Sequence, residues 1–311
     1  MAILVTGGAG FIGSHLCERL LEEHKEIVLV DNLNDYYDPT LKEKNLDILK
    51  EKGKYAFYKV DITDYAALSA VFQKHTITAV IHLAARAGVR ASLEEPVLYS
   101  QVNVLGTMNL LECARQAKVK TFIFGSSSSV YGTNKKTPFS EDDALENIIS
   151  PYAMTKRIGE LLCKEYHDIY GLNVTCLRFF TVYGPRGRPD MAPRKFTEAV
   201  LAGRPIDVYG DGTMKRDYTY VSDIVAGIIT ALQRSYPFAI INLGDNTPRT
   251  ILELITAIEN ATGKKATVNH LPIPTGDVPV TYADITKAAQ LLNYKPKIKI
   301  EEGIKKLVAS P

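Results

Sequence analysis

A tyrosine followed four positions later by a lysine can act as a general base, because the ammonium group favours the phenolate form. The chain of 311 residues contains three such pairs: Tyr55/Lys59, Tyr131/Lys135 and Tyr152/Lys156. The first falls in a predicted strand, where residues four apart are separated by about 13 Å. The second falls in a loop with glycine and proline. Only Tyr152 and Lys156 lie in a predicted helix, where both side chains share one face.

This third pair suits proton transfer beside a nicotinamide ring. A phenol ionises near pH ~10, so a neighbouring ammonium and the positive ring are needed to make it a useful base. Lys156 can also donate a hydrogen bond to the nicotinamide ribose. The run 125–129, Gly-Ser-Ser-Ser-Ser, ends another predicted strand and can supply the group that holds the reacting hydroxyl. The alternative for Tyr152 is an exposed helix tyrosine with no catalytic role.

A glycine-rich segment near the N-terminus predicts a dinucleotide site. Residues 5–13 read Val-Thr-Gly-Gly-Ala-Gly-Phe-Ile-Gly, between a predicted strand and a helix. Gly7 permits the tight turn, Gly10 lets the backbone approach a diphosphate, and Gly13 lets helix pack on strand. The helix N-terminus favours an anion there. A glycine-rich turn without a ligand is the alternative.

Asp31 ends the second predicted strand, 18 positions after Gly13. Its carboxylate can accept a hydrogen bond from a ribose 2′-hydroxyl. The same charge repels the 2′-phosphate of NADP, and residues 32–34 include no arginine to bind one. The expected cofactor is therefore NAD.

The elements that must position these groups alternate between strands and helices. Apolar runs of four to six residues predict strands over 2–5, 26–30, 55–60, 79–83 and 120–124. A helix is predicted from Tyr152 to Tyr170, where Ser150 and Pro151 mark its start, and a sixth strand over 173–180. Alternation of this kind predicts an α/β fold with a doubly wound parallel sheet, whose ligands bind at the carboxyl ends of the strands.

The alternation stops after Phe180, where prolines and glycines cluster. Residues 181–216 are expected to form mainly a substrate-facing segment with one helix near 194–201. A helix over 221–232 and a strand over 239–243 are expected to return to the large sheet, followed by helices near 251–262, 285–292 and 301–308. The predicted domains are 1–180 plus 217–245 for the cofactor, and 181–216 plus 246–311 as a small C-terminal α/β substrate lobe.

The composition excludes several classes of protein. Lys and Arg total 37 against 35 Asp and Glu, a net charge of +2 that is too balanced for a nucleic-acid-binding surface. The apolar runs are shorter than the ~18–20 residues of a membrane span, and the first residues lack the basic region of a signal peptide. The four cysteines contain no Cys-x-x-Cys pair, which suits reduced thiols in a cytoplasmic protein.

Other polar residues are expected to have no part in the chemistry. The six histidines show no metal-ligand spacing, so no metal site is predicted. His82 is expected to be a hydrogen-bonded, partly buried histidine. Glu160 continues the helix of Tyr152 and needs no separate role. Lys42 belongs to a mixed charge pattern typical of a solvated helix face.

The segment Thr6–Gly13 together with Asp31, Ser127 and Tyr152/Lys156 resembles the extended short-chain dehydrogenase/reductase superfamily, in its nucleotide-sugar epimerase and dehydratase branch. The resemblance covers essentially the whole chain and implies a Rossmann-type domain followed by a substrate lobe. It implies that Ser127 binds the sugar 4-hydroxyl. The other residues that it implies for cofactor binding are Phe11, Ile12, Asn32, Asp61, Ile62, Leu83, Ala84, Ala85 and Phe180.

Two longer segments narrow this resemblance. Residues 178–192, Arg-Phe-Phe-Thr-Val-Tyr-Gly-Pro-Arg-Gly-Arg-Pro-Asp-Met-Ala, and residues 31–39, Asp-Asn-Leu-Asn-Asp-Tyr-Tyr-Asp-Pro, resemble UDP-glucuronate 4-epimerases. Sugar-nucleotide 4,6-dehydratases carry Asp-Glu where this chain has Ser128 and Ser129. UDP-glucose 4-epimerases usually carry Asn where this chain has Thr181, whose hydroxyl can donate to a sugar carboxylate.

The resemblance also implies how a UDP-sugar is bound. Thr181, Ser128 and Arg188 are expected to hold the carboxylate. Arg216 would bind the diphosphate, Asp277 a ribose hydroxyl, and Tyr209 would flank the uracil. Helices near 96–117 and 151–170 commonly form a dimer interface in this superfamily, so a homodimer is expected.

The resulting hypothesis is reversible inversion at C4 of UDP-glucuronate through a 4-keto intermediate, giving UDP-galacturonate. One alternative is a UDP-glucose 4-epimerase, which needs the same tyrosine, lysine and serine. A second is a non-catalytic NAD(P)-sensing regulator on the same fold, although such proteins usually lack the Tyr/Lys pair.

Overall fold

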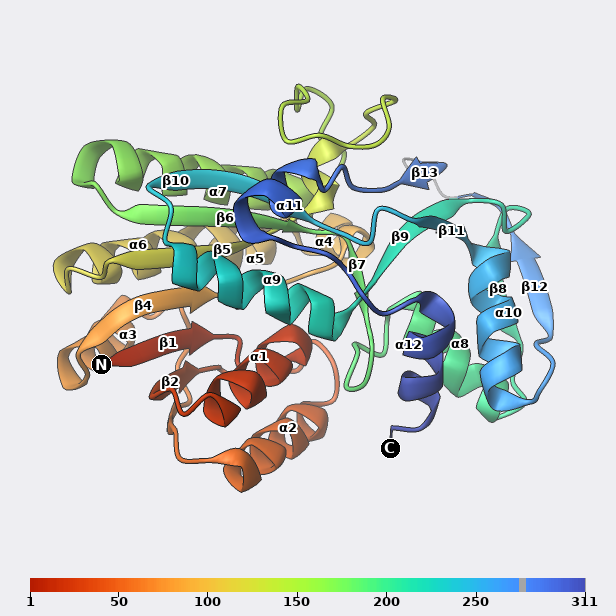
Figure 1. Cartoon of the computed structure of the whole chain (residues 1–311), viewed down its shortest axis with the longest axis horizontal. Coiled ribbons are helices and arrows are strands. Elements are labelled where there is room, and N and C mark those ends of the chain that lie inside the picture. Colours follow the sequence, from red (N-terminus) through yellow and green to blue (C-terminus); the bar gives the residue numbers. More distant parts are fainter. Residues whose placement is uncertain (274–277, 311) are drawn as a thin grey trace. The chain divides into compact units, whose positions relative to one another are not determined.

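The computed structural model describes residues 1–273 and 278–310, which divide into two units (Figure 1). The first unit contains Met1–Gly132, Leu145–Arg178 and Val225–Ile241. The second contains Thr133–Ala144, Phe179–Ile224 and the described part of 242–310.

A seven-stranded sheet forms the centre of the first unit, in the order β10-β6-β5-β4-β1-β2-β3. Its strands are β1 (Ala2–Thr6), β2 (Ile27–Val30), β3 (Ala56–Tyr58), β4 (Ile77–His82), β5 (Thr121–Ser127), β6 (Asn173–Phe179) and β10 (Phe238–Leu243). The pairs β1/β2, β1/β4, β2/β3 and β4/β5 are parallel. This arrangement confirms the predicted Rossmann-type sheet. The order of strands reverses at β1, because β2 and β3 lie on one side of it and β4, β5 and β6 on the other.

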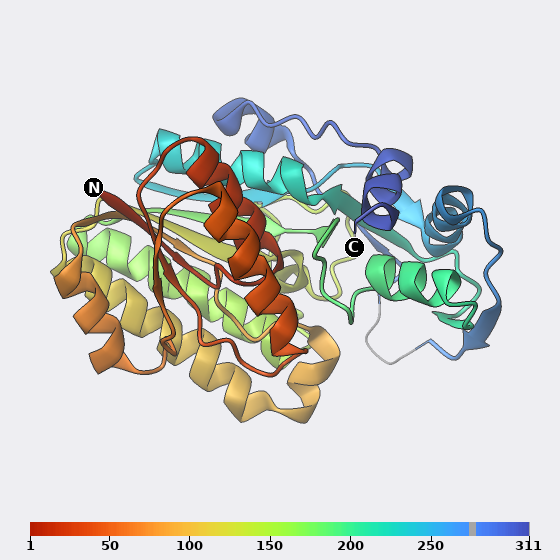
Figure 2. The same ribbon diagram turned by 90° about the horizontal axis from the view of Figure 1, so that it is seen from below.

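Helices cover both faces of this sheet. They are α1 (Phe11–Glu22), α2 (Pro39–Lys52), α3 (Tyr65–Lys74), α4 (Val89–Glu94), α5 (Pro96–Ser100), the π-helical turn η1 (Gln101–Leu105), α6 (Gly106–Gln116), the 3-10 turn η2 (Ser128–Tyr131), α7 (Pro151–Tyr170) and α9 (Val221–Arg234). Figure 2 shows α1 and α9 on one face and α3, α6 and α7 on the other. Strands β1 and β2 are buried along their whole length because apolar side chains point to both layers, whereas the edge strand β3 is partly exposed.

The helix that carries Tyr152 and Lys156 has clear boundaries. The Ser150 hydroxyl accepts a hydrogen bond from the Ala153 N–H at 3.1 Å, and Gly171 ends the helix in the left-handed conformation (φ 70°). A Cβ atom on Gly159 would lie 2.3 Å from the Phe124 ring. The glycine therefore lets α7 pack closely on β5.

The second unit has two smaller sheets. Strand β9 (Lys215–Tyr220) pairs with β7 (Thr181–Tyr183), β11 (Pro248–Thr250) and β13 (Val280–Thr281), and β8 (Ile206–Tyr209) pairs with β12 (Val268–Leu271). The helices are α8 (Ala192–Leu201), α10 (Ile251–Thr262), α11 (Thr286–Leu292) and α12 (Ile300–Val308). The segment 181–216 thus contains strands as well as the predicted helix. These strands are short, and β9 reads Lys-Arg-Asp-Tyr-Thr-Tyr, so hydrophobic alternation does not reveal them.

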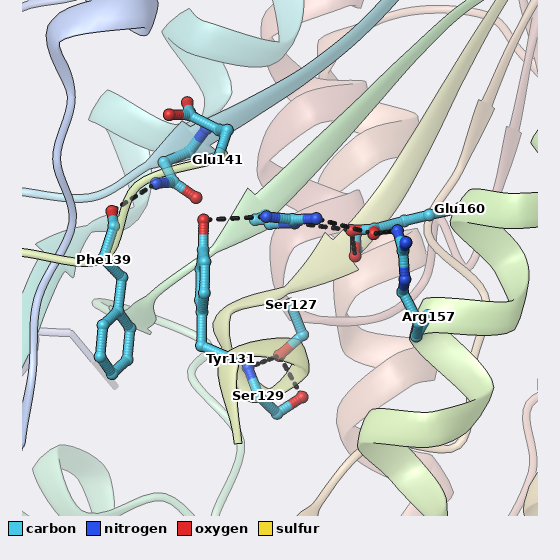
Figure 3. A network of polar contacts seen from close by, with 10 residues as sticks. Ser127, Ser129, Tyr131, Phe139, Glu141, Arg157 and Glu160 are labelled. Atoms are coloured by element: carbon cyan, nitrogen blue, oxygen red, sulfur yellow. Dashed lines mark hydrogen bonds and ion pairs between the residues drawn. The ribbon is translucent and has the colours of Figure 1, made fainter. Parts of the chain in front are cut away.

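Four segments that the predicted domains placed with the first unit lie in the second: residues 133–144, 179–180, 217–224 and 242–245. In residues 217–224, the buried Asp217 carboxylate accepts hydrogen bonds from the backbone N–H groups of Asp245 and Ala283, at 2.7 and 3.1 Å. In residues 133–144, the Glu141 carboxylate accepts a bond from the Asn242 N–H at 2.7 Å (Figure 3). The assignment of cofactor and substrate to separate domains remains a prediction. Over the described residues, no helix is both long and apolar enough to cross a membrane.

Candidate active site

The glycine-rich turn between β1 and α1 is closely packed against its surroundings. Gly7 has φ 70°, and a Cβ atom there would lie 2.7 Å from the Ala84 nitrogen. A Cβ atom on Gly13 would lie 2.1 Å from the Gly7 carbonyl oxygen. On Gly10, by contrast, it would meet only that oxygen within 4 Å, at 3.2 Å. The close approach of a diphosphate to the backbone at Gly10 remains a prediction.

The N-terminus of α1 is suited to an anion. Gly10 is its N-cap and provides no side-chain bond to the first turn, in which Phe11 and Ile12 lie. The first N–H groups of a helix have no partner within the helix, and they carry its positive dipole end. A diphosphate can satisfy these donors, so the turn fits a dinucleotide.

Asp31 lies directly after β2 and is buried. Its carboxylate accepts hydrogen bonds from the N–H groups of Ala9 and Leu33, at 3.1 and 2.9 Å. Burial raises the pKa of this carboxyl, although both N–H bonds oppose the shift. The contact with Ala9 holds Asp31 beside the glycine-rich turn, where a ribose acceptor is expected.

Asn32 and Asp61 lie together after neighbouring strands. The Asn32 amide donates to the Asp61 carboxylate at 2.6 Å, and Asp61 also accepts bonds from the backbone and hydroxyl of Thr63. Burial opposes ionisation of Asp61, but the bonds from Thr63 and Asn32 and the charge of Arg86 together outweigh it and lower the pKa. Ile62 is buried beside Gly106. These contacts fix the loop predicted to meet the adenine.

A buried histidine holds the segment 83–85 against β1. His82 Nδ1 lies 2.7 Å from the Thr6 hydroxyl, and its Nε2 lies 3.0 Å from the Thr107 hydroxyl. The Thr6 oxygen also accepts a bond from the Ala84 N–H at 3.2 Å. Burial lowers the pKa of His82 to about 3, so the ring is neutral. The predicted hydrogen-bonded histidine is confirmed, and its role is to position Leu83, Ala84 and Ala85.

Lys156 is buried and directed toward the end of β5. Its ammonium nitrogen donates to the Gly125 carbonyl oxygen at 2.7 Å and lies 5.1 Å from the centre of the Phe124 ring. Burial lowers the pKa of Lys156 to about 8. The bond to Gly125 places this charge two residues before Ser127.

Tyr152 lies one turn before Lys156, and its ring packs edge-on against Tyr99, with centroids 6.3 Å apart. Helix α7 contacts both β5 and η2. The Ser127 oxygen accepts bonds from the N–H and hydroxyl of Ser129, at 3.2 and 2.9 Å. Neither bond uses the Ser127 proton. The structure thus brings the helix of Tyr152 and Lys156 against the segment of Ser127 and Ser128.

The structure also reveals a buried ion pair that the sequence reasoning missed. Glu160 and Arg178 contact each other and also reach Ser126 and Tyr131 (Figure 3). The prediction that Glu160 needs no separate role overlooked this. The arginine in the predicted strand 173–180 is the available signal, because a charge buried in a sheet requires a partner.

The remaining predicted residues lie in the second unit. Phe180 is buried, and its N–H donates to the Leu243 oxygen at 3.1 Å. Thr181 begins β7, opposite Tyr218 of β9. Arg188 forms two bonds with the Asp190 carboxylate, at 2.9 and 2.5 Å.

Two of the three residues predicted to bind the nucleotide lie on strands of this unit. Tyr209 ends β8 opposite Leu271. Arg216 lies in β9 and donates to the Lys215 carbonyl at 2.9 Å. Asp277 lies outside the described residues. Across the ranges 1–273 and 278–310, no cluster of three or more His, Cys, Asp or Glu side chains could hold a metal ion.

A family model, curated relatives and solved structures each match this chain over nearly its full length. The family model described as GDP-mannose 4,6 dehydratase matches residues 4–307. The UDP-glucuronate 4-epimerase of Thermodesulfobacterium geofontis is 48% identical over 306 residues, which cover 98% of this chain and 94% of that protein. The structure of UDP-glucuronic acid 4-epimerase from Bacillus cereus, in complex with UDP-glucuronic acid and NAD, has a TM-score of 0.93 at 39% identity and covers 99% and 98% of the two chains.

A second kind of epimerase is also similar. The UDP-glucose 4-epimerase of Thermotoga maritima, solved with UDP-glucose, has a TM-score of 0.91 at 35% identity, covering 99% of this chain and 97% of that one. Both sugar preferences therefore occur among proteins with this fold. The two solved epimerase structures share the fold of this chain over nearly its whole length. The chain belongs to the GDP-mannose 4,6-dehydratase family, a part of the extended short-chain dehydrogenases/reductases that also holds the nucleotide-sugar epimerases.

Proposed function

We propose that this protein is an NAD-dependent nucleotide-sugar 4-epimerase that interconverts UDP-glucuronate and UDP-galacturonate. The observation that carries the proposal is the bond from the Lys156 ammonium to the Gly125 carbonyl, 2.7 Å long, beside Ser127. It supports a proton-transfer site at the carboxyl end of β5, where ligands of such sheets bind. The names of the relatives support the choice of reaction and substrate.

The residues around the glycine-rich turn fit NAD. The open backbone at Gly10 and the uncapped start of α1 suit the diphosphate. Asp31 suits the adenosine ribose, and its charge disfavours a 2′-phosphate. When bound there, NAD would supply a nicotinamide able to take a hydride from C4 of the sugar and to return it. No net redox change results, so a single resident cofactor serves every turnover.

The protein's own residues transfer the proton of the sugar 4-hydroxyl. Tyr152 takes the proton of the 4-hydroxyl and later gives it back. The Lys156 ammonium stabilises the phenolate. The Ser127 hydroxyl holds the sugar oxygen next to Tyr152. Inversion requires the 4-keto sugar to turn over between the two halves of the reaction.

Elimination of water is not supported, even though the family model is described by a dehydratase. A 4,6-dehydratase needs an acid and a base after its catalytic hydroxyl residue, and this chain has Ser128 and Ser129 there. Serine hydroxyls do not ionise in the physiological range and cannot replace a carboxyl pair. The 4-keto sugar is therefore expected to be reduced again rather than dehydrated.

Three side chains are proposed for the sugar carboxylate. The hydroxyls of Thr181 and Ser128 can donate to it, and Arg188 can supply a positive charge. The 4-keto intermediate is a β-keto acid, which loses CO₂ when the carboxylate bond stands perpendicular to the carbonyl plane. Holding the carboxylate out of that orientation protects the intermediate. Arg216, Tyr209 and Asp277 are proposed for the nucleotide.

UDP-glucose epimerisation is the second candidate, because a similar fold binds that sugar in the Thermotoga maritima enzyme. Purified protein is given each UDP-sugar separately, and the products are followed by NMR. We expect UDP-galacturonate from UDP-glucuronate, with little turnover of UDP-glucose. Faster formation of UDP-galactose from UDP-glucose would reverse the assignment. A non-catalytic sensor would convert neither sugar.

We also propose a homodimer formed by α5, η1, α6 and α7. Large apolar side chains are exposed along these helices: Val97, Leu105, Met108, Met154, Leu161 and Ile169. Pairing them with a second copy would remove this apolar surface from water. Light scattering after gel filtration should give twice the chain mass. Leu161→Glu should give the monomer, whereas Leu252→Glu on α10 should leave the dimer intact.

The proposed location is the cytoplasm. All four cysteines are free and buried, including Cys17 and Cys113 in the first unit. This usage suits a reducing compartment. Fractionation of cells that express a tagged chain would test the location.

A further inference from the structure

Glu160 and Arg178 form an ion pair inside the first unit. Arg178 Nε lies 2.8 Å from one Glu160 carboxylate oxygen, and Nη2 lies 2.9 Å from the other. The two side chains are 0% and 1% exposed. Glu160 belongs to α7, one turn after Lys156, and Arg178 belongs to β6. The pair therefore bonds the catalytic helix to the sheet.

The same pair reaches both ends of the segment that carries the catalytic serine. The Ser126 hydroxyl donates to Glu160 at 2.7 Å. Arg178 Nη1 donates to the Tyr131 hydroxyl at 3.0 Å, and the guanidinium carbon lies 4.9 Å from the centre of the Tyr131 ring. Figure 3 shows Tyr131 and Glu160 on either side of the guanidinium group. The residues on either side of 127–130, Ser126 and Tyr131, are thus both hydrogen-bonded to the same ion pair.

Within this segment, further bonds fix the catalytic hydroxyl. Ser129 donates twice to the Ser127 oxygen, through its N–H and its hydroxyl. Val130 is fully buried. A displacement at Ser126 or Tyr131 would therefore be transmitted to Ser127.

A contribution to folding stability does not by itself explain why a buried ion pair is present here. Two buried charges lose their hydration, and replacing them with apolar side chains is often neutral or stabilising. Burial opposes ionisation of Glu160, but the bonds and charge of Arg178, together with the bonds from Ser126 and Arg157, outweigh it and lower the pKa. The charges here provide directional bonds to Ser126 and Tyr131 that apolar side chains would not.

We propose that the Glu160–Arg178 pair is a positioning device that sets Ser127 and Ser128 relative to Tyr152 and Lys156. The proposal rests on the proposed function of these residues. Because Glu160 and Lys156 share α7, the helix that holds the proton-transfer pair also holds the serine segment. A small displacement of a positioned group can slow a reaction strongly.

Removing Glu160 or Arg178 would leave a buried charge and endanger folding, so the test uses their neutral partners. Tyr131→Phe removes only the hydroxyl, and Ser126→Ala removes the other contact. Each should lower kcat about tenfold to hundredfold with little change in KM and in bound NAD. In a Ser127→Ala background, the same changes should alter kcat by less than about twofold, since the group they position is absent.

Arg157→Gln is the matched control. Arg157 contacts the same Glu160 carboxylate at 3.0 Å but does not bond to the serine segment, and its side chain is 30% exposed. It should keep the parent kcat. The positioning role would be overturned if Tyr131→Phe lowered kcat by the same factor in the parent and in the Ser127→Ala background. It would also be overturned if kcat were unchanged in both Tyr131→Phe and Ser126→Ala.

A structural measurement separates this proposal from the proposed function. In a crystal structure of the Ser126→Ala/Tyr131→Phe variant, residues 127–130 should be displaced relative to α7 while the sheet is unchanged. An undisplaced Ser127 overturns the positioning role, whatever the substrate. A displaced segment in a protein whose parent converts no UDP-sugar supports positioning and overturns the proposed function instead.

Discussion

The Lys156 ammonium nitrogen lies 2.7 Å from the carbonyl oxygen of Gly125, so α7 is bonded directly to the strand that ends at Ser127. A buried ammonium without such an acceptor would be strongly unfavourable. Even with it, burial lowers the pKa of Lys156 to about 8. The ammonium is therefore retained at neutral pH, next to the tyrosine whose ionisation it is proposed to assist.

Tyr152→Phe should abolish epimerisation and leave the cofactor site intact. Phenylalanine keeps the ring that packs against Tyr99 but has no proton to exchange. A loss of at least about 10²-fold in kcat is expected for removal of a general base. Turnover is measured by NMR, and bound NAD by its absorbance after denaturation. Near-normal turnover in the variant would contradict the assignment of the base.

Lys156 should make stability depend on pH in a defined direction. Its folded pKa of about 8 lies below its ordinary value, so at alkaline pH the unfolded chain binds more protons at this position than the folded chain. Stability therefore rises with pH through this window. Relative to Lys156→Met, the NAD-free parent should gain about 2–3 kcal/mol in the free energy of unfolding between pH 8 and 10.

Urea unfolding of both proteins at several pH values measures this difference, because groups common to both titrate alike. A Lys164→Met variant is the control, since that lysine is half exposed and pairs with Asp168 on the surface. Its difference from the parent should not rise in the same way. A constant difference for Lys156→Met would contradict the lowered pKa.

Local signals explain which parts of the site are predictable. The turn at Gly7, the start of α7 at Ser150 and its end at Gly171 each depend on residues within one turn of the chain. The place of Asp31 beside the glycine-rich turn is predictable because one helix and one strand separate it from Gly13. Strand order then brings these local features together.

Contacts between distant residues were not predictable in the same way. Glu160 looks like an ordinary helix residue until β6 places Arg178 against it. Lys42 belongs to a mixed charge pattern, yet it is buried and donates to the Asn34 carbonyl at 2.8 Å. Asp217 is held by backbone groups far along the chain. Each case depends on packing between elements, which the periodicity of one segment does not contain.

Gly13→Ala should remove bound NAD. Its Cβ would lie 2.1 Å from the Gly7 oxygen and 2.8 Å from the Gly8 Cα, and both are backbone atoms that side-chain rotation does not move. The turn must shift, at a cost of roughly 1–3 kcal/mol in stability. Gly203→Ala is the control, because a Cβ there meets nothing within 4 Å although φ is 66°. It should lose about 1 kcal/mol but keep NAD. Parent-like NAD content in Gly13→Ala would contradict the role of the turn.

Thr181→Val should change the products made from UDP-glucuronate. Valine keeps the shape of the side chain but lacks the hydroxyl proposed to hold the carboxylate away from the orientation that releases CO₂. The yield of decarboxylated UDP-pentose relative to UDP-galacturonate should therefore rise several-fold, as expected when one hydrogen bond worth about 1 kcal/mol or more is lost. NMR of the product mixture measures both sugars at once. Thr256→Val, on the exposed side of α10, is the matched control and should leave the ratio unchanged. If Thr181→Val lowers turnover without altering the product ratio, the hydroxyl serves binding and another group protects the keto acid.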